Sequence, residues 1–118
     1  MKKFLAIYLG SAAAMEKSGW AQLDEATRKA RQEKGMKAWG DWMTTHRANI
    51  AVEGGPLGKT KRTSAKGVED TKNQMSAYVV VEAESHEAAA RMFENHPHFA
   101  IFPGDSVEIM ECPPIPGR

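Results

Sequence analysis

Four histidines and a few acidic side chains are the residues of this sequence that are best able to move protons or bind a metal ion. His46 lies near the end of a predicted helix and can act as a general base if it faces a cleft. Asp70, on a predicted hairpin, is the second candidate for the base. A solvated histidine on a helix is the commoner explanation of a residue such as His46, so catalysis by either residue is a hypothesis.

His96 and His98 flank Pro97 at the predicted end of the second helix. Together with Glu108 or Glu111 they offer the imidazole and carboxylate ligands that suit zinc, but their spacing matches no standard zinc site. The helix dipole favours histidines at a helix C-terminus in any case. We therefore interpret this segment as a capped, solvated helix end and predict no metal site.

Trp39 and Trp42 lie three positions apart on one side of the predicted long helix, together with Met36 and Met43. This pattern is typical of core or dimer contacts. The alternative is an aromatic wall for a flat ligand, which requires a polar partner nearby. In that case Trp39 and Trp42 bind the ligand, and Arg62 is one candidate for the polar partner.

Basic residues gather on the predicted hairpin at Lys59, Lys61, Arg62 and Lys66. They could clamp an anionic ligand, with Arg62 as the planar donor. Charged residues also keep edge strands from pairing with other chains, which explains the pattern without a ligand. The hairpin has no aromatic residue for stacking bases, and 16 basic residues against 15 acidic ones leave the chain nearly neutral. We predict no nucleic-acid partner.

Two glycines and a proline interrupt the short strand predicted at 49–53. Gly54 and Gly55 allow unusual backbone angles and Pro56 removes a hydrogen-bond donor, so a bulge or corner is expected. Gly55 and Pro56 complete the candidate ligand-binding residues. On the long helix, Gly40 beside Trp39 predicts a close contact with the sheet in which a Cβ would not fit.

The hydrophobic pattern predicts a strand, a helix, two strands joined by a long hairpin, a second helix and a last strand. A small, polar segment at 11–18 is predicted as a loop or frayed turn, and Ser85 as the N-cap of the second helix. This order predicts an α+β, ferredoxin-like βαββαβ fold, an antiparallel sheet with both helices on one face. The predicted elements are strand 4–9, one long bent helix or two short helices over 21–47, strand 49–53, hairpin 59–73, a central strand around 78–81, a helix from 85 to 95, and strand 106–112.

The two central strands, 4–9 and 77–81, are apolar on both faces. A single layer of helices covers only one face of such a sheet. The other face would leave an apolar patch of several hundred square ångströms in water, which soluble monomers seldom do. We therefore expect a homodimer that packs sheet against sheet.

Length and composition place the chain among single globular domains. Its 118 residues suffice for one core, and we predict one domain over 1–118 with a tail at 113–118. The single cysteine, Cys112, excludes an intramolecular disulfide and favours a reducing cytoplasm. The apolar run near the N-terminus is short for a leader peptide and reads better as a strand. No segment is long and apolar enough to span a membrane, so no membrane partner is expected.

Six segments in chain order carry a resemblance to a known family: 4–9, Trp39-Gly40-Asp41-Trp42, Glu53-Gly54-Gly55-Pro56-Leu57, 70–78, 83–89 and 104–109. Together they resemble the YCII-related (DGPF) family of small bacterial proteins. The resemblance implies a dimeric α/β barrel with a small-molecule cleft between sheet and helices or between protomers. Some members of this family are linked to dehydrochlorination of aromatic compounds, and a His–Asp pair is suggested as the catalytic unit of short members.

The sequence departs from the family pattern at two places. The helix position that carries the histidine in short members falls near Lys37-Ala38-Trp39, where there is none. Gly67-Val68-Glu69-Asp70 stands where the family has Asp-Gly-Pro-Phe.

Three hypotheses about function follow. The first is a YCII-related protein with a small-molecule cleft, either without an assigned reaction or as a cofactor-independent lyase or dehydrochlorinase on a small aromatic substrate. The second is a metabolite-sensing or interaction module without catalysis. The third is a heme-dependent or cofactor-free monooxygenase, for which no histidine is placed to bind heme. We predict no cofactor.

Overall fold

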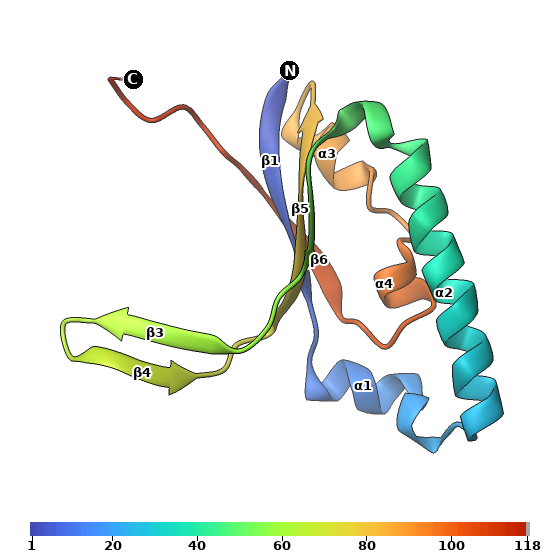
Figure 1. The fold of residues 1–118 in the computed structure, drawn as a ribbon. Coiled ribbons are helices and arrows are strands. Elements are labelled where there is room, and N and C mark those ends of the chain that lie inside the picture. The colour runs from blue at the N-terminus through green and yellow to red at the C-terminus, as the bar shows by residue number, and fades with distance from the viewer. Residues whose placement is uncertain (118) are drawn as a thin grey trace.

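The computed structural model describes residues 1–117; Arg118, the last residue of the predicted tail, lies outside the described residues. The chain has an α+β fold in which helices cover one face of an antiparallel sheet and a hairpin projects from it (Figure 1). The elements are β1 (Lys2–Leu9), α1 (Ala12–Ser18), α2 (Glu25–Thr45), β2 (Ile50–Pro56), β3 (Thr60–Ser64), β4 (Gly67–Thr71), β5 (Met75–Ala83), α3 (His86–Arg91), α4 (Pro97–Ala100) and β6 (Ser106–Glu111), with 3₁₀ turns at Trp20–Gln22 and Arg47–Asn49.

Strands β1 and β5 form the centre of the sheet. Its strand order is β2-β5-β1-β6, and each neighbouring pair is antiparallel. Ala6 lies opposite Val79, and Tyr8 lies opposite Ala77. Because side chains alternate along a strand, these four residues point to the helices. The prediction of an antiparallel sheet with covering helices is confirmed.

The core lies between this sheet face and the helices. Phe4, Ala6, Val79 and Val81 contribute from the sheet, and each is at most 1% exposed. Phe93, which follows α3, packs against them as part of the same buried cluster. Burying such a side chain contributes about 1.5–3 kcal/mol, so this layer is the main source of stability.

The segment 11–18 is a helix, α1, and the prediction of a loop there is wrong. Ser11 caps it, because the Ser11 hydroxyl accepts a hydrogen bond from the Ala14 N–H at 3.0 Å. The alanines that follow are the best helix formers. Gly19, with φ 69°, ends the helix. No residue of α1 is buried, which is why its hydrophobic pattern gives no signal.

Helix α2 is one continuous helix, with Asp24 as its N-cap accepting from the Thr27 N–H at 2.7 Å. The prediction of a close contact at Gly40 is wrong, because a Cβ on this residue would meet no other atom within 4 Å. Gly35 makes the close contact instead. A Cβ on buried Gly35 would lie 2.5 Å from the ring of Phe102, which packs across the helix.

Strand β2 bends where the sequence predicts a bulge. Its register against β5 shifts between Ile50 and Val52 and again between Val52 and Gly55. Gly54 has φ +68°, and a Cβ on it would collide with the carbonyl oxygen of Tyr78. Only glycine fits there without strain.

Strands β3 and β4 pair only with each other and form a separate two-stranded sheet. Figure 1 shows this hairpin reaching away from the body on the side opposite the helices. Two cross-strand ion pairs hold it, Lys61–Asp70 at 2.6 Å and Arg62–Glu69 at 2.5 Å. All four side chains are largely exposed.

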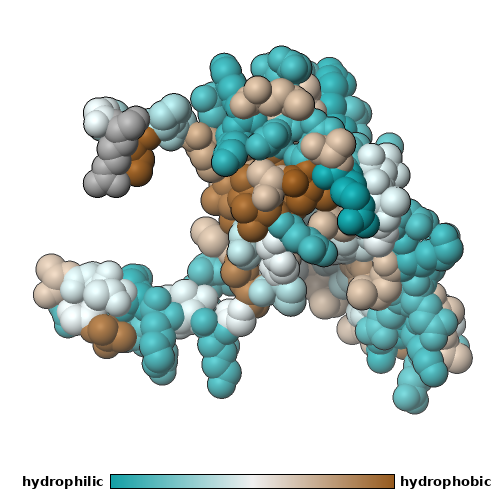
Figure 2. Space-filling view, turned by 45° about the horizontal axis from the view of Figure 1, so that its top comes forward, coloured by the Kyte–Doolittle hydropathy of each residue, from teal (hydrophilic) through white to brown (hydrophobic). Residues whose placement is uncertain are grey.

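The second face of the sheet carries no helix from residues 1–117. Leu5, Ile7 and Val80 lie on it half-buried, while Val52 and Met110 at its flanks are 48% and 41% exposed. Figure 2 shows hydrophobic surface gathered between the two projecting arms, the hairpin β3–β4 and the C-terminal segment. We call this surface, formed by these five residues, the open face.

Within residues 1–117, no helix combines the length and the apolar character that crossing a membrane requires.

Candidate functional site

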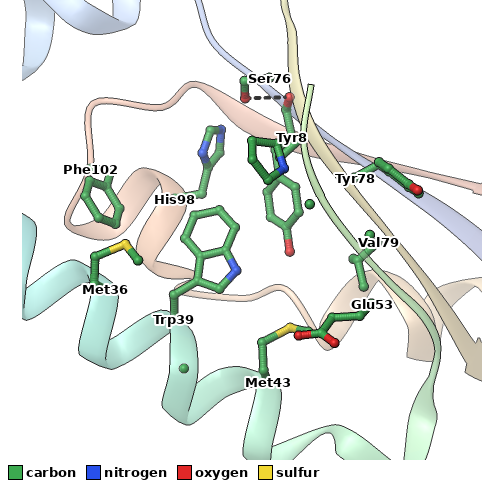
Figure 3. A pocket seen from close by; sticks show the side chains of 15 residues that line it. Tyr8, Met36, Trp39, Met43, Glu53, Ser76, Tyr78, Val79, His98 and Phe102 are labelled. Carbon is green, nitrogen blue, oxygen red and sulfur yellow. Dashed lines mark hydrogen bonds between the residues drawn. The ribbon is translucent and has the colours of Figure 1, made fainter. Parts of the chain in front are cut away.

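A cavity of about 660 Å³ opens between α2, strands β2 and β5, and the segment that holds α4 (Figure 3). Its walls are mostly apolar, and few polar side chains face it. The lining includes Tyr8, Met36, Trp39, Gly40, Met43, Glu53, Gly55, Pro56, Ser76, Val79, His98 and Phe102. Pockets of this size and character are typical of small-molecule sites.

Aromatic rings form one wall of the cavity. The rings of Tyr8 and Trp39 lie 4.8 Å apart between centroids, and those of Tyr8 and His98 lie 5.2 Å apart, edge to face. Trp39 comes from the middle of α2, and Tyr8 from near the end of β1. Figure 3 shows both rings beside the same opening, with His98 next to them.

His96 is fully buried behind this wall and is locked in one tautomer. Its Nδ1 accepts a hydrogen bond from the backbone N–H of His98 at 3.0 Å, so Nδ1 carries no proton. The ring proton therefore sits on Nε2, which lies 3.2 Å from the hydroxyl of Tyr8 and donates to it. Burial, helped by His98 and His46, lowers the pKa of His96 to about 3, so the ring stays neutral.

His98 is held just as firmly. Its Nε2 lies 2.7 Å from the carbonyl oxygen of Leu9, which can only accept, so Nε2 carries the proton. Nδ1 is then the unprotonated nitrogen of a ring that lines the cavity. Burial lowers the pKa of His98, while the Leu9 carbonyl and the Asp105 carboxylate act in the opposite direction. A Cβ on Gly104 would collide with this ring, so the loop before β6 fits tightly around it.

The prediction that His96 and His98 form a solvated helix end is wrong. His96 is 0% exposed and His98 is 7% exposed. The second helix divides: α3 ends at Arg91, and Pro97 opens the short helix α4, with His96 as its N-cap. Pro97 itself indicates the start of a new helix, because proline is favoured at the first position of a helix.

The structure places the candidate ligand-binding residues in three different environments. Trp39, Gly55 and Pro56 line the cavity. Trp42 lies in the core, where its Nε1–H donates to the carbonyl of Met92 at 2.8 Å. Arg62 lies on the hairpin β3–β4 and pairs with Glu69.

The two candidate bases are not brought together. His46 is half-buried at the C-cap of α2, with its ring centroid 4.7 Å from that of Trp42 and tilted against it, and burial lowers its pKa. Asp70 lies exposed on β4, paired with Lys61. Neither residue belongs to the lining of the cavity. The sequence missed Tyr8, Glu53, Ser76 and His98, which do line it.

Within residues 1–117, no three His, Cys, Asp or Glu side chains are grouped so that they could hold a metal ion. The side chains that line the cavity can instead exchange hydrogen bonds and protons. Tyr8 is a phenol whose pKa burial raises, and His98 is a neutral imidazole whose Nδ1 has no hydrogen-bond partner among residues 1–117. Such a pair can bind an oxygenated ring and can move a proton on it.

No protein-family model and no curated protein sequence matches the chain. Among solved structures, it is similar to 5-chloro-2-hydroxyhydroquinone dehydrochlorinase (TftG) from Burkholderia phenoliruptrix, in complex with 2,5-dihydroxybenzoquinone. The alignment has a TM-score of 0.53 and 18% sequence identity, and it covers 92% of this chain and 90% of that chain. At this identity the likeness concerns the fold.

Proposed function

We propose that this chain is a YCII-related, ferredoxin-like protein of the dimeric α/β barrel type whose cavity binds a small planar phenol or quinone. The observation that carries the proposal is the cavity of about 660 Å³ with Tyr8 and Trp39 along one wall and His98 beside them. Flat aromatic walls favour a flat ligand, and a few polar groups fix its orientation. The similar fold of TftG, solved with 2,5-dihydroxybenzoquinone, supports the same class of ligand.

The proposed second copy packs on the open face. Leu5, Ile7 and Val80 supply an apolar centre, and Val52 and Met110 extend it. Burial of that surface would be worth about 25 cal/mol for each square ångström. We expect sedimentation velocity at micromolar concentration to give a dimer. A monomer under these conditions would contradict this part of the proposal.

Binding can be tested with 2,5-dihydroxybenzoquinone as the probe. We expect it to quench tryptophan fluorescence through Trp39 and to raise the melting temperature, because a ligand of the folded state stabilises it. Gly40→Leu is a suitable blocking variant. A Cβ at Gly40 meets nothing within 4 Å, so a larger side chain would enter the cavity without disturbing the helix packing. Wild type without any response to the probe would contradict the proposal.

A second candidate function is elimination of HCl from a chlorinated hydroxyhydroquinone, and His98 is the observation that favours it. One ring hydroxyl first gives its proton to the carbon that bears chlorine, so that this carbon becomes tetrahedral and the ring gains a carbonyl. The Nδ1 lone pair of His98 can then accept the proton of a second hydroxyl. The electron pair of that O–H bond forms the second carbonyl, and the carbon–chlorine bond breaks with its electron pair on chloride, which leaves a hydroxyquinone. Removal of a general base usually costs about 10²–10⁴ in rate. A protein that binds the ring without releasing chloride would instead be a metabolite-sensing or interaction module.

Chloride release from 5-chloro-2-hydroxyhydroquinone separates these candidates. His98→Gln keeps an amide donor for the Leu9 carbonyl and removes the basic nitrogen, so we expect chloride release to be lost. His46→Ala and Asp70→Ala, which change residues outside the cavity, should leave it unchanged. Loss of activity in these two variants, with His98→Gln active, would favour the bases predicted from the sequence instead.

A further inference from the structure

We infer that Tyr8 and Trp39 form a two-donor site for one oxygen atom of the bound ring, and that His96 is the positioning residue that turns the Tyr8 hydroxyl into a donor toward the cavity. The inference rests on the proposed function for the class of ligand. Beyond that function, it names the two donor groups that recognise the ligand oxygen and the residue that directs the Tyr8 donor toward the cavity.

The Tyr8 hydroxyl oxygen already accepts a hydrogen bond from within the protein. The Nε2–H of His96 donates to it at 3.2 Å, because the other nitrogen of His96 accepts from the backbone of His98. Within residues 1–117 the hydroxyl proton of Tyr8 has no acceptor of its own. Figure 3 shows the hydroxyl end of Tyr8 directed between Trp39 and Val79, beside the cavity that all three residues line. A ligand oxygen is the acceptor that completes this group.

Trp39 supplies the second donor. The two tryptophans of α2 differ here: the Nε1–H of Trp42 donates to the Met92 carbonyl at 2.8 Å, whereas that of Trp39 has no partner among residues 1–117. The Trp39 and Tyr8 rings lie 4.8 Å apart, and Figure 3 shows the indole nitrogen on the side of the Tyr8 hydroxyl. Two neighbouring donors with no acceptor favour a carbonyl or phenolate oxygen over a group that can only donate.

The chemistry of the two donors also persists over a wide pH range. Burial raises the pKa of Tyr8, so the phenol keeps its proton, and burial keeps His96 neutral and in a single tautomer. The site therefore presents hydrogen-bond donors without a positive charge. A quinone carbonyl or a phenolate oxygen suits these two donors, because each offers lone pairs that can accept from both.

Matched variants test each donor with 2,5-dihydroxybenzoquinone as the probe. Tyr8→Phe and Trp39→Phe keep an aromatic wall and each remove one donor. We expect the Kd to rise about tenfold or more in each, as for the loss of a hydrogen bond to a charged or strongly accepting oxygen. Asp70→Ala changes an exposed residue outside the cavity, so its Kd should stay within about threefold of wild type. Unchanged binding by Tyr8→Phe would overturn the inference.

The role of His96 needs variants that separate its two hydrogen bonds. His96→Asn keeps an acceptor for the backbone N–H of His98 and removes the donor to Tyr8. His96→Gln places an amide donor near the position of Nε2 and so should recover binding relative to His96→Asn. The same weak binding in both folded variants would indicate a purely structural role for His96 and would overturn that part of the inference.

The ¹⁵N chemical shifts of the His96 ring give a readout that needs no ligand. A protonated Nε2 and an unprotonated Nδ1 in wild type are expected, and the opposite tautomer would overturn the inference. If the wild-type protein does not bind the probe, the proposed function is contradicted. The direction of the Tyr8 donor would then be decided by the tautomer of His96 alone.

Discussion

The helix-covered face and the open face of the sheet are built from the same two strands and are similarly apolar, yet they differ in where polar groups lie. On the covered face, Tyr8 reaches two buried histidines, His96 and His98. On the open face, Leu5, Ile7 and Val80 form the centre. Apolar strands alone therefore do not tell which face binds a ligand. The feature that distinguishes the covered face is a polar side chain, Tyr8, that forms a hydrogen bond with a residue of the helical layer.

Neighbouring positions on β5 test this difference most strongly. Val81→Asp would place a carboxylate where Val81 is 0% exposed, and we expect it to prevent folding, since an unpaired buried charge costs well over about 4 kcal/mol. Val80→Asp changes the open face one residue earlier. We expect it to remain folded by circular dichroism and to sediment as a monomer. A dimeric Val80→Asp would show that the open face is not the interface.

The buried histidines should make stability depend on pH. The pKa of His96 is about 3 in the folded protein and near its ordinary value of 6.5 when unfolded, so between these values the unfolded chain binds more protons. Stability is therefore full above pH 6.5 and falls as the pH drops toward 3. His96 alone should lower the free energy of unfolding by about 2 kcal/mol between pH 7 and pH 5.

Urea denaturation at these two pH values, at one protein concentration, measures this difference. His98 changes in the same direction, since burial also lowers its pKa. His96→Asn removes the titrating ring and should reduce the pH dependence. An unchanged dependence in this variant would assign the effect to other groups. The open face should contribute little, because its central residues do not titrate.

Substitutions at two glycines of α2 test how tightly the helix packs on the covered face. Gly35→Ala would push on Phe102, so we expect a net loss of about 1 kcal/mol after the gain in helix propensity is included. Gly40→Ala has open space around it and should stabilise by up to about 1 kcal/mol. Thermal denaturation of both variants gives the comparison. Equal effects would mean that Phe102 moves aside freely.

The smallest effect is expected on the hairpin beside the open face. Lys61→Ala and Arg62→Ala each break an exposed ion pair and should change the free energy of unfolding by less than about 1 kcal/mol. Probe affinity should not change, because neither residue lines the cavity. Weaker binding in Arg62→Ala would restore Arg62 as the polar partner predicted from the sequence.

Local patterns in the sequence identify most of the fold. The continuous apolar runs of β1 and β5 and the cap at Ser85 are local patterns, and the structure has both strands and the cap. Helix α1 was missed because it buries no residue, so no apolar stripe marks it.

The candidate site was less accessible to sequence reasoning. His96 gains its partner from Tyr8, 88 positions away along the chain, and no local pattern reports that contact. Trp39 and Trp42 look alike in the sequence, but only the packing of the segment after α3 gives one of them a hydrogen-bond partner.

The hairpin β3–β4 also bears on how this fold can vary in length. The chain leaves the sheet after Pro56 and returns at Met75, and at that point the N–H of Leu57 donates to the carbonyl of Ser76 at 2.9 Å. The two ends are thus already joined, and extending the connection between them costs little entropy. We therefore expect that residues 58–73 can be shortened, lengthened or exchanged while the cavity, which they do not line, keeps its shape.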